Sequence, residues 1–167
     1  MGTGQTLLTI GAIFILGTVI LTTNRSLNDT SAVLMHSNIG LEEVSLATSI
    51  MEEAEGKAFD QNTDSNAVTS TSQLTPASLL GQENNNPNDL DDFDDYNGLN
   101  NQGLRETFQL STGTYVVLTR VCYVPSNDPS GPASTTQTWN KRMDIWVWNT
   151  LTPDTVKMST VYSYWNF

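Results

Sequence analysis

The chain contains 167 residues and carries a formal net charge of −11, with 18 acidic residues against seven Lys and Arg. Because the phosphates of nucleic acid are bound through basic surfaces, this balance excludes nucleic acid as an expected partner. The single cysteine, Cys122, allows no intramolecular disulfide, and we expect it to act as a small apolar side chain within a strand.

The first predicted element is an uncharged, apolar segment at residues 6–23, TLLTIGAIFILGTVILTT. Its length is at the lower end of what crosses a bilayer as a helix, since each residue adds about 1.5 Å to a hydrocarbon core about 30 Å thick. A membrane span and a buried helix are both consistent with this length. The flanks contain neither a basic n-region nor an Ala-x-Ala pattern, so we expect the segment to be retained rather than cleaved as a secretory signal.

Small residues within this segment predict close packing against other helices. Gly11 and Gly17 each cost about 1 kcal/mol relative to Ala in a helix in water. Between helices packed in an apolar medium they instead allow the backbones to approach closely. The threonines can bond back to carbonyls of their own helix, so their hydroxyls do not forbid lipid. We therefore predict a helix that packs against copies of itself. The candidate polymerisation residues are Gln5, Leu7, Leu8, Ile10, Gly11, Ala12, Phe14, Ile15, Gly17 and Ile20.

The same helix is predicted to continue over residues 4–58, because no proline occurs before Pro76. Beyond Arg25, small and apolar residues recur at spacings of three and four, which predicts one face lying on a folded head. That face comprises Val33, Ser37, Gly40, Val44, Ala47, Met51, Ala54 and Ala58, with Leu27, Leu34 and Leu41 as a neighbouring row. The places at which this helix could bend or melt are Gly40 and the Asn-containing residues 25–31. The opposite face, expected to meet water or neighbouring molecules, carries Glu42, Glu43, Glu52, Glu53, Glu55 and Lys57.

A polar and acidic connection is predicted at residues 61–106. Asn, Ser, Thr and Gln dominate its first part, so we expect no strong element there, with Leu79 and Leu80 as anchors. Its later part is an acidic run in which Asn97 and Gly98 follow five aspartates, Asp89, Asp91, Asp92, Asp94 and Asp95. Carboxylates at this density repel one another unless a cation, donors or water lie between them.

The acidic run has two interpretations that the sequence leaves open. Calcium is the first, because it takes six to eight oxygen ligands and tolerates irregular loops. The spacing does not match an EF-hand loop, and the predicted ligands are Asp91, Asp92, Asp94, Asp95 and Asn97. The second is a solvated acidic turn whose Asp side chains cap backbone amides, with Phe93 and Tyr96 pointing inward and Asn97-Gly98 supplying positive φ.

The remainder, residues 107–167, reads as an antiparallel sheet. Strands are predicted at residues 107–111, 113–124, 142–148 and 155–165, the last two joined by the turn residues 151–154. The expected fold class is α+β, with a long N-terminal helix packed on this sheet. Trp146 and Trp148 alternate onto the face opposite Ile145, where they either contact neighbouring molecules or lie under the proline-rich loop at residues 125–135.

This layout resembles that of type IV pilins and the related pseudopilins, and the residue-level resemblance lies in MGTGQTLLTIGAIFILGTVIL. It implies a leader peptide removed by a dedicated peptidase that also methylates the new N-terminus, with Met1 as the mature residue or as the initiator. Members usually have Glu at the fifth mature position, paired with the N-terminal amine of the preceding subunit. If Met1 is the mature start, Gln5 stands at that position, where an amide can accept a hydrogen bond from the amine but cannot neutralise its charge.

The expected function is assembly. The resemblance implies a subunit that waits in the cytoplasmic membrane and is then moved by pilus assembly machinery into an extracellular helical filament of identical copies. Two alternatives stay open: a pseudopilin or minor pilin of a secretion or uptake machine, and a membrane-anchored, calcium-dependent adhesive module. No enzyme is expected, because the only histidine, His36, lies on the predicted helix and the chain has neither a phosphate-binding loop nor a zinc motif.

Overall fold

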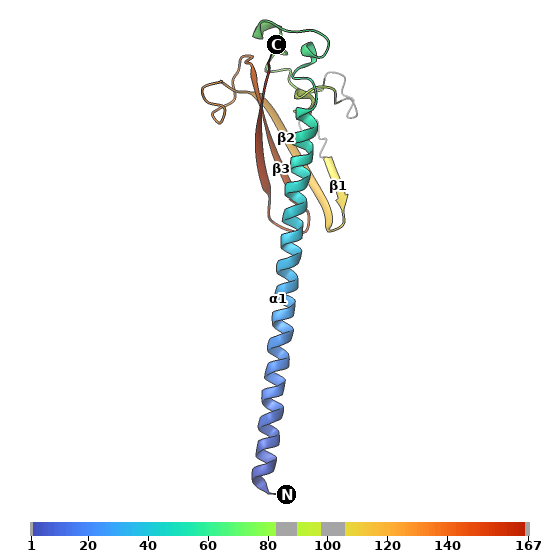
Figure 1. Cartoon of the computed structure of the whole chain (residues 1–167), viewed down its shortest axis with the longest axis vertical. Helices are drawn as coiled ribbons and strands as arrows, with labels where there is room; N and C mark the ends of the chain where they lie inside the picture. The colour runs from blue at the N-terminus through green and yellow to red at the C-terminus, as the bar shows by residue number, and fades with distance from the viewer. Residues whose placement is uncertain (1, 83–89, 98–105, 166–167) are drawn as a thin grey trace. The chain divides into compact units, whose positions relative to one another are not determined.

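The computed structural model describes residues 2–82, 90–97 and 106–165 (Figure 1). The chain divides into two compact units, Met1–Ile39 and Gly40–Phe167, which are described separately below. The fold is α+β as predicted: one long N-terminal helix is followed by a four-stranded antiparallel sheet. The predictions made for Met1, Asp89 and Gly98 lie outside the described residues.

Helix α1 spans Thr3–Glu55, and its part up to Ile39 makes up the first unit. The helix is uninterrupted through residues 25–31 and through Gly40, so neither of the two expected bending places breaks it. The predicted threonine back-bonding is confirmed. Each of these hydroxyls donates to a carbonyl three or four residues earlier, at 2.5–2.9 Å: Thr6, Thr9, Thr18, Thr22 and Thr23.

The second unit contains the sheet, whose strands are β1 (Glu106–Leu110), β2 (Gly113–Tyr123), β3 (Asn140–Asn149) and β4 (Val156–Ser163). They pair in the order β1-β2-β3-β4, each antiparallel to the next. All four predicted strands are present, with ends within two residues of the expected positions. Gly113 has φ of 142°, a conformation that favours glycine, and it ends the two-residue connection between β1 and β2.

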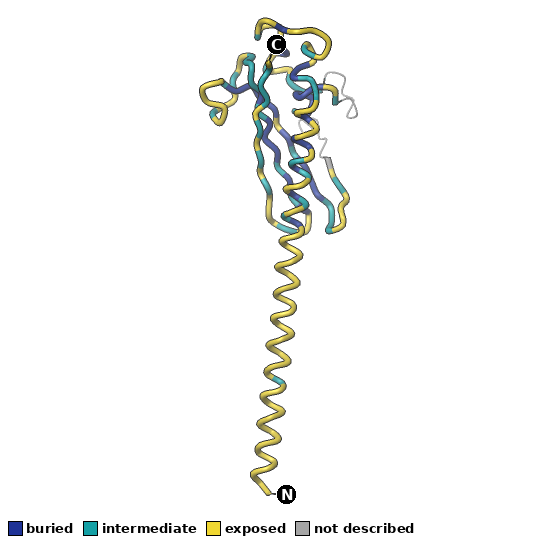
Figure 2. Tube along the Cα trace, in the orientation of Figure 1, coloured by how far each residue is buried: buried dark blue, intermediate teal, exposed yellow. Residues whose placement is uncertain are grey.

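Alternation along β2 and β3 separates the two faces of the sheet. The register pairs Val117 with Val147 and Val121 with Met143, and all four are buried on the face toward α1. Trp146 and Trp148 point to the opposite face, as predicted, and both are half-buried there. Figure 2 shows the buried positions concentrated where the sheet meets the end of α1.

The side of α1 that packs on the sheet differs in part from the predicted face. In the second unit the buried residues of α1 are Glu43, Ala47, Ile50, Met51 and Ala54. Val33, Ser37 and Val44 are exposed, and so is the row formed by Leu27, Leu34 and Leu41, so these residues were wrongly assigned to the packed face. At about 100° per residue, Leu41 lies on the side of the helix opposite Ala54. A row with a seven-residue repeat drifts around the helix axis, so it does not stay on the face that packs on the sheet.

The connection after α1 also has more structure than the sequence suggested. It contains two single turns of 3-10 helix, η1 (Gln61–Thr63) and η2 (Thr71–Gln73), and each begins with a capping box. Val68 and Leu74, rather than Leu79, anchor it by packing with Phe59 and Tyr123. Leu79 is 67 % exposed, whereas Leu80 does pack against this cluster, which we call the loop core.

Candidate functional site

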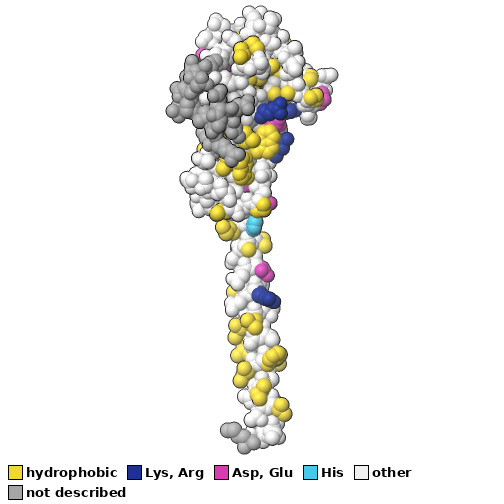
Figure 3. All heavy atoms as spheres, turned by 180° about the vertical axis from the view of Figure 1, so that it is seen from behind, with side chains coloured by type: hydrophobic (Ala, Val, Ile, Leu, Met, Phe, Trp, Pro, Cys, Tyr) yellow, Lys and Arg dark blue, Asp and Glu magenta, His cyan; other side chains and the backbone are white. Residues whose placement is uncertain are grey.

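Two features of the molecule stand out as candidate sites. The first is the apolar surface of α1 in the first unit. Its large side chains at the predicted polymerisation positions are between 52 % and 76 % exposed, and Figure 3 shows hydrophobic side chains along the helix. By length and composition α1 is able to cross a membrane, and no part of its most apolar window is buried within the described chain. The residues concerned are Leu7, Leu8, Ile10, Phe14, Ile15 and Ile20.

The glycines in this segment have no explanation within the chain itself. A Cβ added at Gly11 or at Gly17 meets no described atom within 4 Å, so no intramolecular contact requires a missing side chain there. Glycine nevertheless costs a helix about 1 kcal/mol relative to Ala at each position. A bare helix surface of this kind would let a second backbone come near.

The second candidate site is a buried ionic network in the second unit. Lys141 on β3 reaches across the inner face, and its ammonium donates to the Asp60 carboxylate at 2.9 Å between Nζ and Oδ2. The same ammonium bonds to Asp94, which opens the short helix η3 (Asp94–Tyr96). All three side chains are completely buried. Asp60 also accepts hydrogen bonds from Thr75 and from the Tyr123 hydroxyl, which hold its carboxylate in place.

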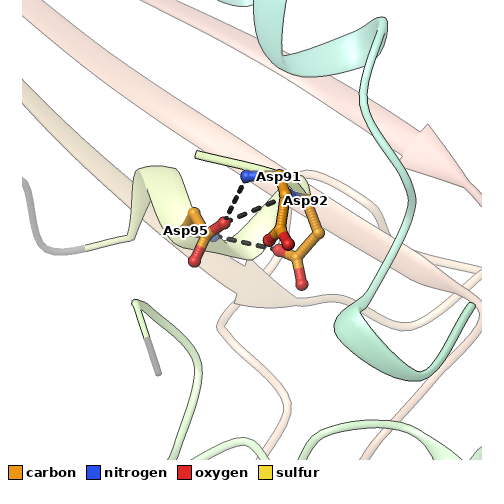
Figure 4. Close-up of side chains that lie close together, drawn as sticks. All are labelled: Asp91, Asp92 and Asp95. Carbon is orange, nitrogen blue, oxygen red and sulfur yellow. Dashed lines mark hydrogen bonds between the residues drawn. The ribbon is translucent and has the colours of Figure 1, made fainter. Parts of the chain in front are cut away.

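The acidic run folds onto this network as a tight, hydrogen-bonded loop. Residue Asp92 forms a parallel bridge with Ala58, and its side chain accepts hydrogen bonds from the backbone amides of Asp94 and Asp95. In return, Asp95 accepts from the amides of Asp91 and Asp92 at 2.8 and 3.1 Å. Figure 4 shows the resulting arrangement of the three side chains that carry one oxygen each within 4.8 Å of the others: Asp91, Asp92 and Asp95.

The second interpretation assumed that this loop is solvated, but the loop is largely buried. Asp92, Asp94 and Asp95 are at most 1 % exposed, and Asp91 is the exposed one among the aspartates that the structure describes in this run. The capping of backbone amides and the inward positions of Phe93 and Tyr96 are confirmed. Asn97 has φ of −78°, so it is not the residue of the Asn97-Gly98 pair that supplies positive φ, and Gly98 lies outside the described residues.

Burial controls the acidity of these carboxyl groups. Loss of hydration raises the pKa of Asp92 to about 8, with a further increase from the charge of Asp94. Burial likewise raises the pKa of Asp95 to about 7. Burial raises the pKa of Asp94 to about 6 even though the Lys141 ammonium opposes the change. Asp60 behaves differently: burial opposes its ionisation, but Lys141 and the backbone amides outweigh burial, so its pKa is lowered.

The structure brings together only some of the residues predicted as calcium ligands. Asp94 is bonded to Lys141, and the Asn97 side chain is occupied in joining the Leu80 carbonyl to the Val121 amide, at 2.8 and 3.0 Å. Asp91, Asp92 and Asp95 remain as the group whose oxygens converge. The pairing of β1 with β2 extends only to Val117. Beyond that point the β2 edge is covered by Tyr96 and Asn97, which accept hydrogen bonds from the Thr119 hydroxyl and the Val121 amide.

Three buried, charged positions were missed in the sequence. Lys141 continues the inward alternation of Met143 and Ile145. A predicted strand that began before residue 142 would have placed its side chain on the inner face. Asp60 opens a capping box with Thr63, a recognisable pattern. Glu43 had been assigned to the solvent side but is 1 % exposed, because its carboxylate accepts from the backbone amide of Asn149 at 3.0 Å. No local signal distinguished Glu43 from its neighbours.

The outer face of the sheet bears a groove of about 480 Å³ beside Trp146, with Leu118 and Arg120 on β2 in its lining. Ala133 and Ser134 of the proline-rich loop form another part of that lining. Lys157 lies 5.0 Å from the centre of the Trp146 ring, and Figure 3 shows basic and hydrophobic side chains next to one another on this face. Cys122 is buried, and its burial raises the pKa of the thiol, in keeping with a packing role.

No protein-family model matches the chain, and neither a curated protein nor a solved structure matches it. The architecture can therefore be compared only by its layout. A long apolar N-terminal helix followed by an antiparallel sheet is consistent with a pilin-like arrangement.

Proposed function

We propose that this protein is the structural subunit of an extracellular helical filament of the type IV pilus kind, and that it polymerises through the apolar part of α1. The observation that carries the proposal is the exposure of residues 6–23: an uncharged helix surface that no described part of the chain covers. Burying one Leu, Ile or Phe side chain gains about 1.5–3 kcal/mol. A segment with this many exposed apolar side chains is thus strongly driven into an apolar surrounding.

Two such surroundings are open to it in succession. The first is the cytoplasmic membrane, where a helix of this length and composition is stable before assembly. The second is the interior of a filament built from identical helices. Moving from lipid into that interior exchanges one apolar environment for another, so hydrophobicity alone does not decide between the two. Packing decides, and the unexplained glycines at positions 11 and 17 support a close helix–helix contact as the deciding factor.

The resemblance to type IV pilins supplies the remaining partners of this proposal, namely a leader peptidase and a pilus assembly machinery that delivers the subunit to the cell surface. If Met1 is the mature first residue, Gln5 is the point of departure from that family. Its side chain can accept a hydrogen bond from the N-terminal amine of a neighbouring copy without neutralising it, so registration in this filament rests on packing more than on charge.

The decisive experiment replaces Gly11 and Gly17 together by Leu in the full-length protein expressed in its host. We expect the variant to reach the membrane fraction as the wild type does, because Leu is more apolar than Gly. Filaments are expected to be lost, since two bulky side chains prevent the close approach. Electron microscopy of fibres sheared from the cell surface measures the outcome, and resistance to alkaline extraction measures membrane insertion.

The matched control replaces the same two glycines by Ala, which remains small and favours the helix. Filaments should persist in this control. Abundant, normal filaments from the Leu variant would contradict packing through this face. A wild-type protein that stays in the membrane and is absent from sheared fibres would instead favour the pseudopilin alternative.

A further inference from the structure

The interior of the second unit holds more carboxyl groups than the described basic residues pair with. Asp60, Asp92, Asp94 and Asp95 are each at most 1 % exposed, and among the described residues Lys141 is the cation that forms ion pairs within this group. A buried charge is costly unless it is paired or hydrogen-bonded. Asp60 and Asp94 share the ammonium, and no described residue forms an ion pair with Asp92 or Asp95.

Three oxygens of this network also have no donor. When the carboxyl groups are ionised, Asp92 Oδ2, Asp94 Oδ2 and Asp95 Oδ1 are buried and no described residue donates a hydrogen bond to them. Buried polar atoms in native proteins are almost always satisfied, so these open acceptors indicate a partner beyond the residues that the structure describes. The other oxygens of Asp92 and Asp95 are held by backbone amides, which fixes both carboxylates in position.

We propose that Asp91, Asp92 and Asp95 bind a divalent metal ion, and that the ion is calcium. Each of the three provides an oxygen within 4.8 Å of the other two, a spacing that one ion bridges. All the donors are hard oxygens on an irregular loop, which suits calcium, and water can complete its six to eight ligands. Asp91 is exposed and gives the ion a route from solvent to the two buried carboxylates.

The other residues of the network hold the loop in place and do not bind the ion. Lys141 holds Asp94 on the inner side of the sheet, so Asp94 is a positioning residue and not a ligand. Asn97 fixes the end of η3 to β2 through the Val121 amide, and the Ala58 carbonyl accepts from the Phe93 amide at 2.8 Å. An ion at this site therefore joins the end of α1 to the edge of β2, and its binding should stabilise the whole unit. This inference does not depend on filament formation.

The experiment uses the full-length protein solubilised in detergent at pH 7.5, titrated with calcium chloride and followed by calorimetry. With three carboxylate ligands, a dissociation constant of about 0.1–1 mM is expected, in the range of extracellular calcium modules. Thermal unfolding provides the second readout. At calcium a hundredfold above the dissociation constant, the Tm should rise by roughly 5–10 °C over the value in EDTA. Magnesium chloride is the comparison ion, and we expect it to give a smaller shift.

Two variants test the assignment of ligands. Asp91→Asn removes charge from an exposed residue, so the fold is retained and calcium affinity should fall about tenfold. Asp95→Asn should abolish the calcium-dependent rise in Tm. The matched control is Asp64→Asn, an exposed aspartate outside the network, which should behave like the wild type.

Calcium binding by the wild type that is unchanged in Asp91→Asn would overturn the assignment. No heat of binding and no change in Tm at 10 mM calcium would overturn the site itself, because protons would then be what neutralises the buried carboxyl groups. Either result can be obtained whether or not the protein forms fibres, so failure of this inference is distinguishable from failure of the proposed function.

Discussion

The ammonium of Lys141 lies 2.9 Å from the Asp60 carboxylate, and both side chains are completely excluded from solvent. The two residues are 81 positions apart in the chain. The pair therefore joins the segment that follows α1 to the third strand of the sheet. The same ammonium lies 4.6 Å from the centre of the Phe59 ring, so its surroundings combine anions with an aromatic face.

Replacing Lys141 by Met is expected to destabilise the protein by about 3–5 kcal/mol, because it leaves buried carboxylates without their cation. The change preserves much of the side-chain volume, so the loss reports charge rather than a cavity. Urea unfolding of the detergent-solubilised protein, followed by tryptophan fluorescence, measures it. Lys157→Met is the matched control: this exposed lysine lies over Trp146, and its loss should cost about 0.5–1 kcal/mol. Equal effects of the two substitutions would show that the buried pair is not a significant source of stability.

Glu43 and Glu42 are adjacent on α1 and should influence the pH dependence of stability in opposite directions. Burial raises the pKa of Glu43, although the Asn149 amide opposes the shift. The folded state therefore holds its proton more tightly than the unfolded state, and ionisation of Glu43 reduces stability as the pH rises above 4.5, its ordinary value. Glu43→Gln keeps an acceptor for the Asn149 amide and removes the charge. We expect this variant to be more stable than the wild type at pH 7, and the difference to disappear at pH 4 and below.

Glu42 provides the control of opposite sign. Hydrogen bonds from Thr112 and Ser111 lower its pKa, so its contribution is present above the ordinary pKa and is lost as the pH falls through the lowered value. Glu42→Gln should therefore be less stable than the wild type at pH 7 and approach it in acid. Unfolding free energies measured between pH 3 and pH 8 test both variants. A pair of curves that change in the same direction would contradict this description of the two carboxylates.

The loop core allows a test of how the connection after α1 is anchored. Leu74 is 2 % exposed and packs with Phe59, Val68 and Tyr123, so Leu74→Ala should cost about 2–5 kcal/mol. Leu79→Ala makes the same chemical change at a side chain that is 67 % exposed, and its effect should stay within about 0.5 kcal/mol. Thermal unfolding of the two variants shows whether Leu74 or Leu79 anchors the connection. A larger effect at Leu79 would mean that the connection is anchored as the sequence alone suggested.

The sequence was sufficient for the elements whose signal is local. An uncharged run such as residues 6–23 predicts an apolar helix wherever it occurs, because its composition alone sets its preference for lipid or for other helices. The strands were predictable for the same reason: Met143, Ile145 and Val147 alternate with Trp146 and Trp148, and a strand places alternate side chains on opposite faces. Pattern and period carry this information within a window of about ten residues.

The tertiary structure alone decided which charges are buried. Nothing near Glu43 or Asp60 in the sequence indicates that either is excluded from water, and their partners, Asn149 and Lys141, lie 106 and 81 residues away. The acidic run was visible as a dense group of carboxylates, yet its division into Asp94, bound to Lys141, and the converging Asp91, Asp92 and Asp95 depends on how the loop meets the sheet. Burial of a charge is a property of the whole fold, because the energy that permits it comes from partners brought together only when distant segments pack.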